Sequence, residues 1–65
     1  MKMTQHILAV LPQGERASTS EIALRLRVRG VWFVEARIWP ALRALEDANQ
    51  LERINGHPNT AFFRR

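Results

Sequence analysis

The chain has 65 residues, of which 46% are hydrophobic, and it contains no cysteine. A chain this short forms one domain, residues 1–65, and buries only about 60% of its unfolded surface, which leaves no room for an enclosed catalytic cleft. The lack of cysteine excludes disulfides and zinc–thiolate sites, so packing alone must hold the fold.

Ten basic and six acidic residues give a net charge of +4, and Lys2 is the only lysine. The planar guanidinium of arginine suits phosphates and guanine edges, but the same charge also serves solubility, so composition leaves both explanations open. No signal-peptide pattern is present, and no apolar run approaches the roughly 18 residues that a membrane helix needs. We therefore expect a cytoplasmic protein that does not bind membranes.

A first short helix is predicted near the N-terminus, where the Thr4 hydroxyl can act as N-cap. Its apolar stripe consists of Ile7, Leu8, Val10 and Leu11. Pro12 and Gly14 then end the helix.

A second helix is predicted to start at the capping box Ser18-Thr19-Ser20-Glu21, with Ser18 as N-cap and the Glu21 side chain reaching back to the cap N–H. Its buried side consists of Ile22, Ala23 and Leu26. Gly30 suits the left-handed residue that follows a helix, so we expect the helix to end there.

The connection to the third helix carries two large aromatic residues, Trp32 and Phe33. Large aromatic side chains are the main buried area available to a small domain, so we expect both to plug the core. The alternative is an exposed patch that contacts DNA or a protein partner.

The third helix, expected over about residues 34–48, organises the rest of the chain. Its apolar face consists of Ile38, Ala41, Leu42 and Leu45, at the helical period. Proline costs about 3 kcal/mol inside a helix but little in its first turn, so the start is expected near Val34 or Glu35, with a kink at Pro40 as the alternative. Asn49 is expected to stop the helix in a left-handed conformation.

A β-hairpin is predicted at the C-terminal end, with strands at Leu51–Ile54 and Thr60–Arg64 around the turn signals Asn-Gly and Pro-Asn. Side chains alternate along a strand, so one of Phe62 and Phe63 should face the core. A minimal strand near Arg16-Ala17 completes the predicted α+β fold of three helices followed by a hairpin.

The run Trp39-Pro40-Ala41-Leu42-Arg43-Ala44-Leu45-Glu46 resembles the recognition helix of winged helix-turn-helix DNA-binding domains, most closely that of the PadR family of regulators. Two features depart from the family pattern: Asn49 stands where glycine is usual, and one extra residue precedes Leu51. The resemblance implies sequence-specific binding of double-stranded DNA in transcription regulation. The third helix would enter the major groove, and the 51–64 hairpin would form the wing.

Small or basic side chains occupy the expected outer face of the third helix. An arginine there can bind guanine O6 and N7, and free N–H groups at the start of the second helix can bind a phosphate. Hairpin side chains are expected near phosphates or in a minor groove. The predicted DNA-binding residues are Ser18, Thr19, Arg29, Arg37, Pro40, Arg43, Arg53, His57, Asn59, Arg64 and Arg65.

Three acidic residues, Glu35, Glu46 and Asp47, would repel phosphates if they faced them. They favour the competing hypothesis, a protein-interaction module that uses exposed Trp32, Phe33 and Trp39.

Regulators of the PadR type carry a further C-terminal helix for dimerisation, which these 65 residues do not contain. A homodimer through exposed aromatics, or an accessory DNA-bending factor of the excisionase kind, is therefore a further hypothesis. Compact domains of this kind are familiar from mobile elements and phages.

No enzyme activity is expected. Ser18 and Ser20 act as caps, the two histidines are far apart without metal-ligand spacing, and no glycine-rich phosphate loop is present. We accordingly expect no catalytic residue, metal or cofactor.

Overall fold

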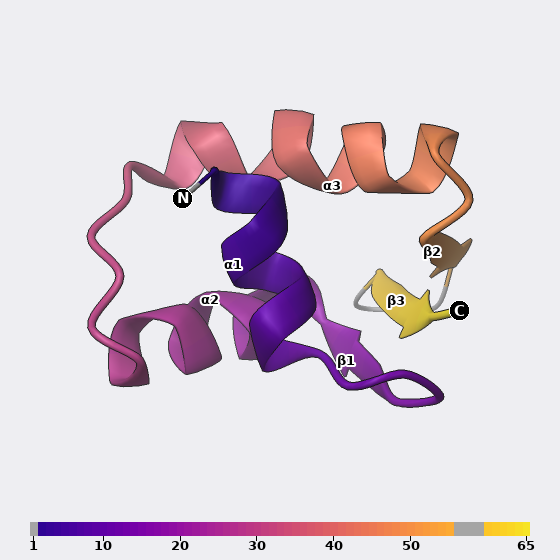
Figure 1. The fold of residues 1–65 in the computed structure, drawn as a ribbon, viewed down its shortest axis with the longest axis horizontal. Coiled ribbons are helices and arrows are strands. Elements are labelled where there is room, and N and C mark those ends of the chain that lie inside the picture. Colours follow the sequence, from indigo (N-terminus) through magenta and orange to yellow (C-terminus); the bar gives the residue numbers. More distant parts are fainter. Residues whose placement is uncertain (1, 56–59) are drawn as a thin grey trace.

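A computed structural model describes residues 2–55 and 60–65 (Figure 1). The α-helices are α1 (Met3–Val10), α2 (Thr19–Val28) and α3 (Ile38–Asp47), and a 3-10 turn, η1 (Glu35–Arg37), directly precedes α3. The strands β1 (Arg16–Ser18), β2 (Leu51–Ile54) and β3 (Ala61–Arg64) form an antiparallel sheet in the order β1-β3-β2. The predicted α+β class and the minimal strand at Arg16 are confirmed.

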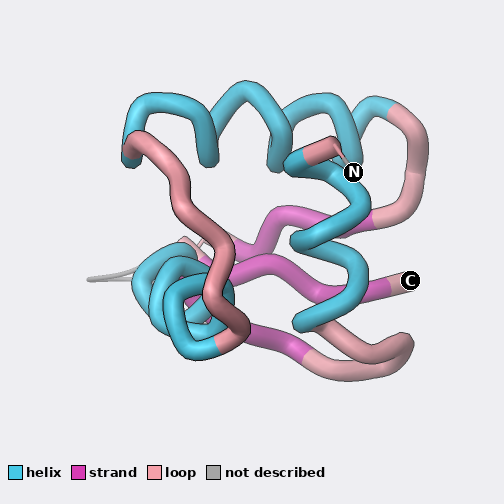
Figure 2. Tube along the Cα trace, turned by 60° about the vertical axis from the view of Figure 1, so that its left-hand side comes forward, coloured by secondary structure: helices cyan, strands magenta, loops and turns pink. Residues whose placement is uncertain are grey.

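The helices surround a common centre and the sheet lies at one end of the molecule. Figure 1 shows α3 and α2 along opposite edges, with α1 crossing in front of the space between them. Figure 2 shows the segment that joins α2 to η1 running along the outside. Within the described residues, every helix is too short or too polar to cross a membrane.

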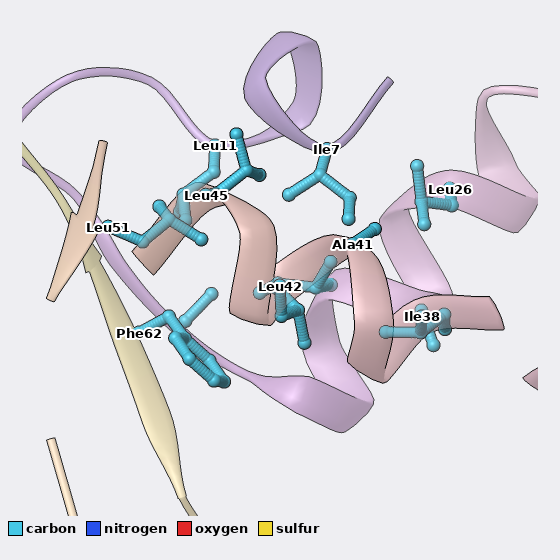
Figure 3. Close-up of a cluster of buried hydrophobic side chains, with 12 residues drawn as sticks. Ile7, Leu11, Leu26, Ile38, Ala41, Leu42, Leu45, Leu51 and Phe62 are labelled. Atoms are coloured by element: carbon cyan, nitrogen blue, oxygen red, sulfur yellow. The ribbon is translucent and has the colours of Figure 1, made fainter. Parts of the chain in front are cut away.

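The core lies where the inner sides of the helices meet the sheet (Figure 3). The predicted apolar face of α3 is buried and consists of Ile38, Ala41, Leu42 and Leu45. It packs with Ile7 and Leu11 of the N-terminal segment and with Phe62 of β3, all of which are fully buried. Phe63 is only partly buried, so the predicted alternation along this strand is confirmed.

Both predicted helix stops are present. Gly30 after α2 has φ +86° and Asn49 after α3 has φ +60°, the left-handed region that glycine and, less often, asparagine adopt. After α3, the N–H of Asn49 donates to the Glu46 carbonyl oxygen (3.0 Å) and that of Gln50 to the Leu45 carbonyl oxygen (2.9 Å). These bonds satisfy the last carbonyls of α3 and turn the chain directly into β2.

The predicted N-cap of α1 is wrong. The helix begins at Met3 with Lys2 as N-cap, and Thr4 lies inside the first turn. The reason is the Gln5 side chain, whose Oε1 accepts a hydrogen bond from the Lys2 N–H at 2.8 Å. The Lys2 N–H is thereby satisfied, and the helix starts two residues earlier than a Thr4 cap would place it.

Of the two hydrogen bonds of the predicted α2 capping box, the described residues form only one. The Ser18 hydroxyl accepts a hydrogen bond from the Glu21 N–H at 3.1 Å, as predicted. The Glu21 carboxylate does not reach back but lies 3.0 Å from the Arg25 guanidinium. An arginine one turn along the helix therefore takes the carboxylate that the cap was expected to use.

The predicted continuous helix over residues 34–48 is divided in two. Val34 precedes η1, whose Arg37 N–H donates to the Val34 carbonyl oxygen at 2.8 Å, and the α-helix starts only at Ile38. This start makes Pro40 the third residue of α3, where the missing N–H would have no partner within the α-helix. The change from 3-10 to α-helix therefore lies before Pro40 and not at it.

The prediction that Trp32 plugs the core is wrong: this side chain is 86% exposed. The segment 31–34 has no regular hydrogen bonding, and its side chains alternate: Val31 and Phe33 pack against the core while Trp32 and Val34 are exposed. Neighbours in an extended segment point to opposite sides, so only one of the two aromatics can face inward.

Candidate nucleic-acid interface

The solvent side of α3 carries the most coherent group of predicted residues. Because the apolar face is turned inward, Pro40 and Arg43 are exposed, and so is Arg37 one residue before the helix. Trp39 lies on the flank of the helix and is 44% exposed. This side of α3 therefore offers two cations and an aromatic surface to a partner.

The charges on this side are not neutralised within the fold. Among residues 2–55 and 60–65, neither Arg37 nor Arg43 forms an ion pair, and neither does Asp47, although Asp47 lies one helical turn from Arg43. In the same part of the chain, histidine and acidic side chains form no group of three or more that could hold a metal ion. The free guanidinium groups are available to an anionic partner.

Two hollows border α3, and Trp39 lines both. The first, which we term the inter-helix hollow, has a volume of about 280 Å³ and is lined by Thr19, Ser20, Ala23, Glu35, Ala36, Ile38 and Trp39. The second, the α3 hollow, has a volume of about 400 Å³ and is lined by Trp39, Pro40, Arg43, Ala44 and Asp47. Trp39 thus stands between a hollow shared with the start of α2 and a hollow on the outer side of α3.

Trp39 is held in place by two neighbours, Phe62 and Arg53. Its ring meets Phe62 edge-on, with ring centroids 6.0 Å apart and planes at 64°. The Arg53 guanidinium lies 5.7 Å from each of these two rings, and its Nη2 is 3.0 Å from Glu46. The predicted DNA-binding residue Arg53 is therefore engaged in holding Trp39 and α3 to β2.

The hairpin arginines also have partners within the protein. Arg64 donates from Nη1 to Gln50 Oε1 (3.0 Å) and to the Arg65 carbonyl oxygen (2.9 Å). The Arg65 guanidinium lies 3.2 Å from a Glu52 carboxylate oxygen. Phosphate contacts by these arginines would compete with bonds already made. The predicted residues His57 and Asn59 lie outside the described residues.

The two predicted residues at the start of α2, Ser18 and Thr19, differ in whether their hydroxyl groups are hydrogen-bonded. The Ser18 hydroxyl is used as the helix cap. Thr19 borders the inter-helix hollow, but its hydroxyl oxygen is buried and has no hydrogen-bond partner among the described residues. A ligand could therefore reach this hydroxyl only after the side chain rotates.

Arg29 lies apart from the other predicted residues. It caps the C-terminal end of α2, which Figure 1 shows at the edge of the molecule opposite α3. It borders a third, shallow hollow together with the exposed apolar side chains Leu24 and Val28. The structure does not bring it together with Arg37 and Arg43.

Sequence reasoning missed two residues of the α3 hollow. Ala44 is not singled out from the sequence, and Asp47 is considered there only as a charge that would repel phosphates. Their spacing held a usable signal: Trp39, Arg43 and Asp47 recur every four residues, and Ala44 follows Pro40 by four. Residues one turn apart lie on the same side of a helix, so the row Trp39, Arg43 and Asp47 and the row Pro40 and Ala44 lie next to each other on the outer side of α3.

Comparison with known proteins adds no relative. No family model matches the chain, and neither the curated proteins nor the solved structures contain a significant match. Functional inference therefore depends on the residues and their geometry.

Proposed function

We propose that the chain is a winged helix-turn-helix domain that binds double-stranded DNA sequence-specifically, in the cytoplasm, as a small transcription regulator. In this proposal α3 enters the major groove and the β2–β3 hairpin forms the wing. The order of elements, with β3 paired between β1 and β2, is compatible with the fold that the resemblance of the Trp39–Glu46 run implies.

The observation that carries the proposal concerns two exposed arginines, Arg37 directly before α3 and Arg43 on the outer side of α3, which have no ion partner among the described residues. An α-helix with its side chains is about 10–12 Å wide and fits a major groove of about 12 Å. An arginine presented there can bind O6 and N7 of guanine with two hydrogen bonds. Base contacts of this kind carry sequence preference, which phosphate contacts do not.

The N-terminus of α2 supports the same orientation. The inter-helix hollow is lined both by Thr19 and Ser20 and by Trp39, so the first turn of α2 borders the same region as α3. Unpaired N–H groups at a helix start attract phosphate. In the first turn of α2 the N–H groups of Thr19 and Glu21 are already bonded, to the Thr60 carbonyl oxygen and the Ser18 hydroxyl, whereas that of Ser20 has no partner among the described residues. A DNA backbone beside α3 would find the Ser20 N–H.

Acidic residues near the proposed face oppose DNA less than the sequence suggests. Glu35 lies 4.0 Å from the Arg27 guanidinium, and Glu46 lies 3.0 Å from that of Arg53. The Glu46 charge is thus compensated within the protein, whereas Glu35 and Arg27 are both largely exposed and interact only weakly. Asp47 alone faces the proposed groove without a cation partner among the described residues.

A protein-interaction module is the second candidate, and the exposure of Trp32 favours it. An indole that is 86% exposed resembles the aromatic anchors of protein interfaces. Binding through such an anchor responds little to salt, whereas phosphate binding weakens steeply as salt rises. Salt dependence therefore separates the two candidates.

The test is selection of purified full-length chain against a random duplex pool at two salt concentrations, followed by sequencing. We expect an enriched motif and an affinity that falls with salt, by about 0.9 logarithmic units per phosphate contact for each tenfold increase. A two-fold repeat in the motif would indicate a homodimer, and binding without a motif would indicate an accessory DNA-bending factor. Absence of binding at low salt would contradict the proposal.

A further inference from the structure

The α3 hollow has a lining that bare phosphate recognition does not explain. Its apolar walls are Trp39, Pro40 and Ala44, and its charged residues are Arg43 and Asp47. All five come from the outer side of one helix. A basic helix that met only phosphates would need no apolar recess of about 400 Å³.

Neither Pro40 nor Ala44 can hydrogen-bond a base through its side chain. The two lie one turn apart on α3, beside the row formed by Trp39 and Arg43. This part of the surface can therefore contribute only apolar contact. The neighbouring Arg43 can contribute a charged hydrogen bond.

The indole wall of the hollow is fixed before any partner arrives. Trp39 packs edge-on against the buried Phe62 and lies under the Arg53 guanidinium. A side chain that is already ordered loses little rotamer freedom on binding, so contact with it is not offset by an entropy cost.

We propose that the α3 hollow receives the 5-methyl group of a thymine in the major groove, which makes Trp39 and Ala44 specificity-determining residues. This inference rests on the proposed DNA binding. Thymine is the base that presents an apolar group in the major groove, and it is read by apolar side chains. Arg43, which has no ion partner among the described residues, gives the hollow a cation that suits a polyanion. Asp47 lies one turn further along α3 and also lacks a cation partner there, so the phosphates must lie on the Trp39 side of the hollow, away from this carboxylate.

The positions of Trp39 and Arg43 also constrain the target. Four residues correspond to about 6 Å along a helix axis, and base pairs are about 3.4 Å apart. A guanine bound by Arg43 therefore lies within about two base pairs of the thymine, and the selected motif should contain both bases at this spacing.

The test is a deoxyuridine scan of the selected duplex, in which each thymine is replaced in turn and the dissociation constant is measured by fluorescence anisotropy. Deoxyuridine lacks only the methyl group. We expect about fourfold weaker binding at one thymine, since one buried methyl group is worth roughly 0.8 kcal/mol and 1.4 kcal/mol is tenfold. The other thymines should be unaffected.

Two variants connect the effect to the hollow. Ala44→Gln places a larger side chain in it, so the thymine-to-uridine ratio at the sensitive position should fall to about one. Ala9→Gln makes the same change at an exposed alanine of α1 and should keep the fourfold ratio. Circular dichroism and thermal unfolding check that both variants are folded.

The outcomes are distinguishable. A flat scan, a motif without thymine near its guanine, or an unchanged ratio in Ala44→Gln would overturn the assignment of the hollow while DNA binding stands. No binding to any duplex would overturn the proposed function and this inference together.

Discussion

The arginines on the outer side of α3 and those of the β2–β3 hairpin differ in what they already contact. Arg37 and Arg43 form no ion pair within the described part of the chain. Arg53 and Arg65 lie 3.0 and 3.2 Å from glutamate oxygens, and Arg53 also covers two aromatic rings. The same residue type is thus left without an ion partner in one region, as far as the described residues show, and is used by the fold in the other.

This difference shows that the net charge of +4 is not spread evenly over the surface. Each glutamate lies within 4.0 Å of a nitrogen of Arg25, Arg27, Arg53 or Arg65, so these four arginines are compensated locally and the excess positive charge lies on the other basic residues. The charge that remains for an anionic partner includes the outer side of α3. Three substitutions test whether the α3 arginine binds DNA and the hairpin arginines stabilise the fold.

The largest effect is expected for Arg43→Ala. Loss of a bidentate guanine contact should cost about 1–3 kcal/mol of discrimination, which corresponds to roughly 5- to 150-fold in the dissociation constant. Because Arg43 makes no ion pair among the described residues, the free energy of unfolding should change by less than about 0.5 kcal/mol. Competition binding with the selected duplex and with base-substituted duplexes measures the first quantity, and thermal unfolding measures the second.

Arg16→Ala is the charge-matched control for that substitution, since Arg16 is exposed on β1 and also forms no ion pair within residues 2–55 and 60–65. It should leave base preference intact. Equal loss of preference in the two variants would show that α3 does not read the bases.

The second effect, on stability, is expected for Arg53→Ala. Removing two cation–π contacts and one partly exposed ion pair should lower the free energy of unfolding by about 1–2 kcal/mol. For a domain of this size, each kcal/mol lowers the melting temperature by about 4–8 °C. Arg53→Lys keeps the charge but not the planar stack, so its melting temperature should lie in between. An unchanged melting temperature in Arg53→Ala would show that this arginine does not support the fold.

The smallest effect is expected for Glu52→Gln, which removes the carboxylate that lies 3.2 Å from Arg65. The pair is half-exposed, so stability should change by less than about 0.5 kcal/mol. The freed guanidinium can then reach a phosphate, which should steepen the salt dependence by about one phosphate contact. An unchanged slope would mean that the hairpin arginine does not approach DNA even when it is unpaired.

Local signals in the sequence were sufficient for much of the fold. The period of Ile38, Leu42 and Leu45 identifies the buried side of α3, and Asn49 marks its end, because both depend on residues within a turn or two. The exposure of Trp32 could not be predicted in this way. It depends on how the segment 31–34 packs on the core. This is a tertiary contact, which composition does not predict.

The candidate site was predictable to a similar extent. Helical spacing places Arg43 and Pro40 on the outer side of α3 once the apolar side is known. The ion pair and the aromatic contacts of Arg53 could not be predicted, because its partners Glu46, Trp39 and Phe62 come from two other elements. Pairing between elements decides which arginines remain free, and a single sequence does not display it.

The order β1-β3-β2 leaves short strands at both edges of the sheet. Exposed backbone edges are the usual starting point for strand pairing between copies and for aggregation. Here one edge is three residues long and starts at the exposed Arg16, and the other is four residues long and carries the exposed Glu52. Short, charged edges template such pairing poorly, so the protein should stay free of strand pairing between copies at high protein concentration.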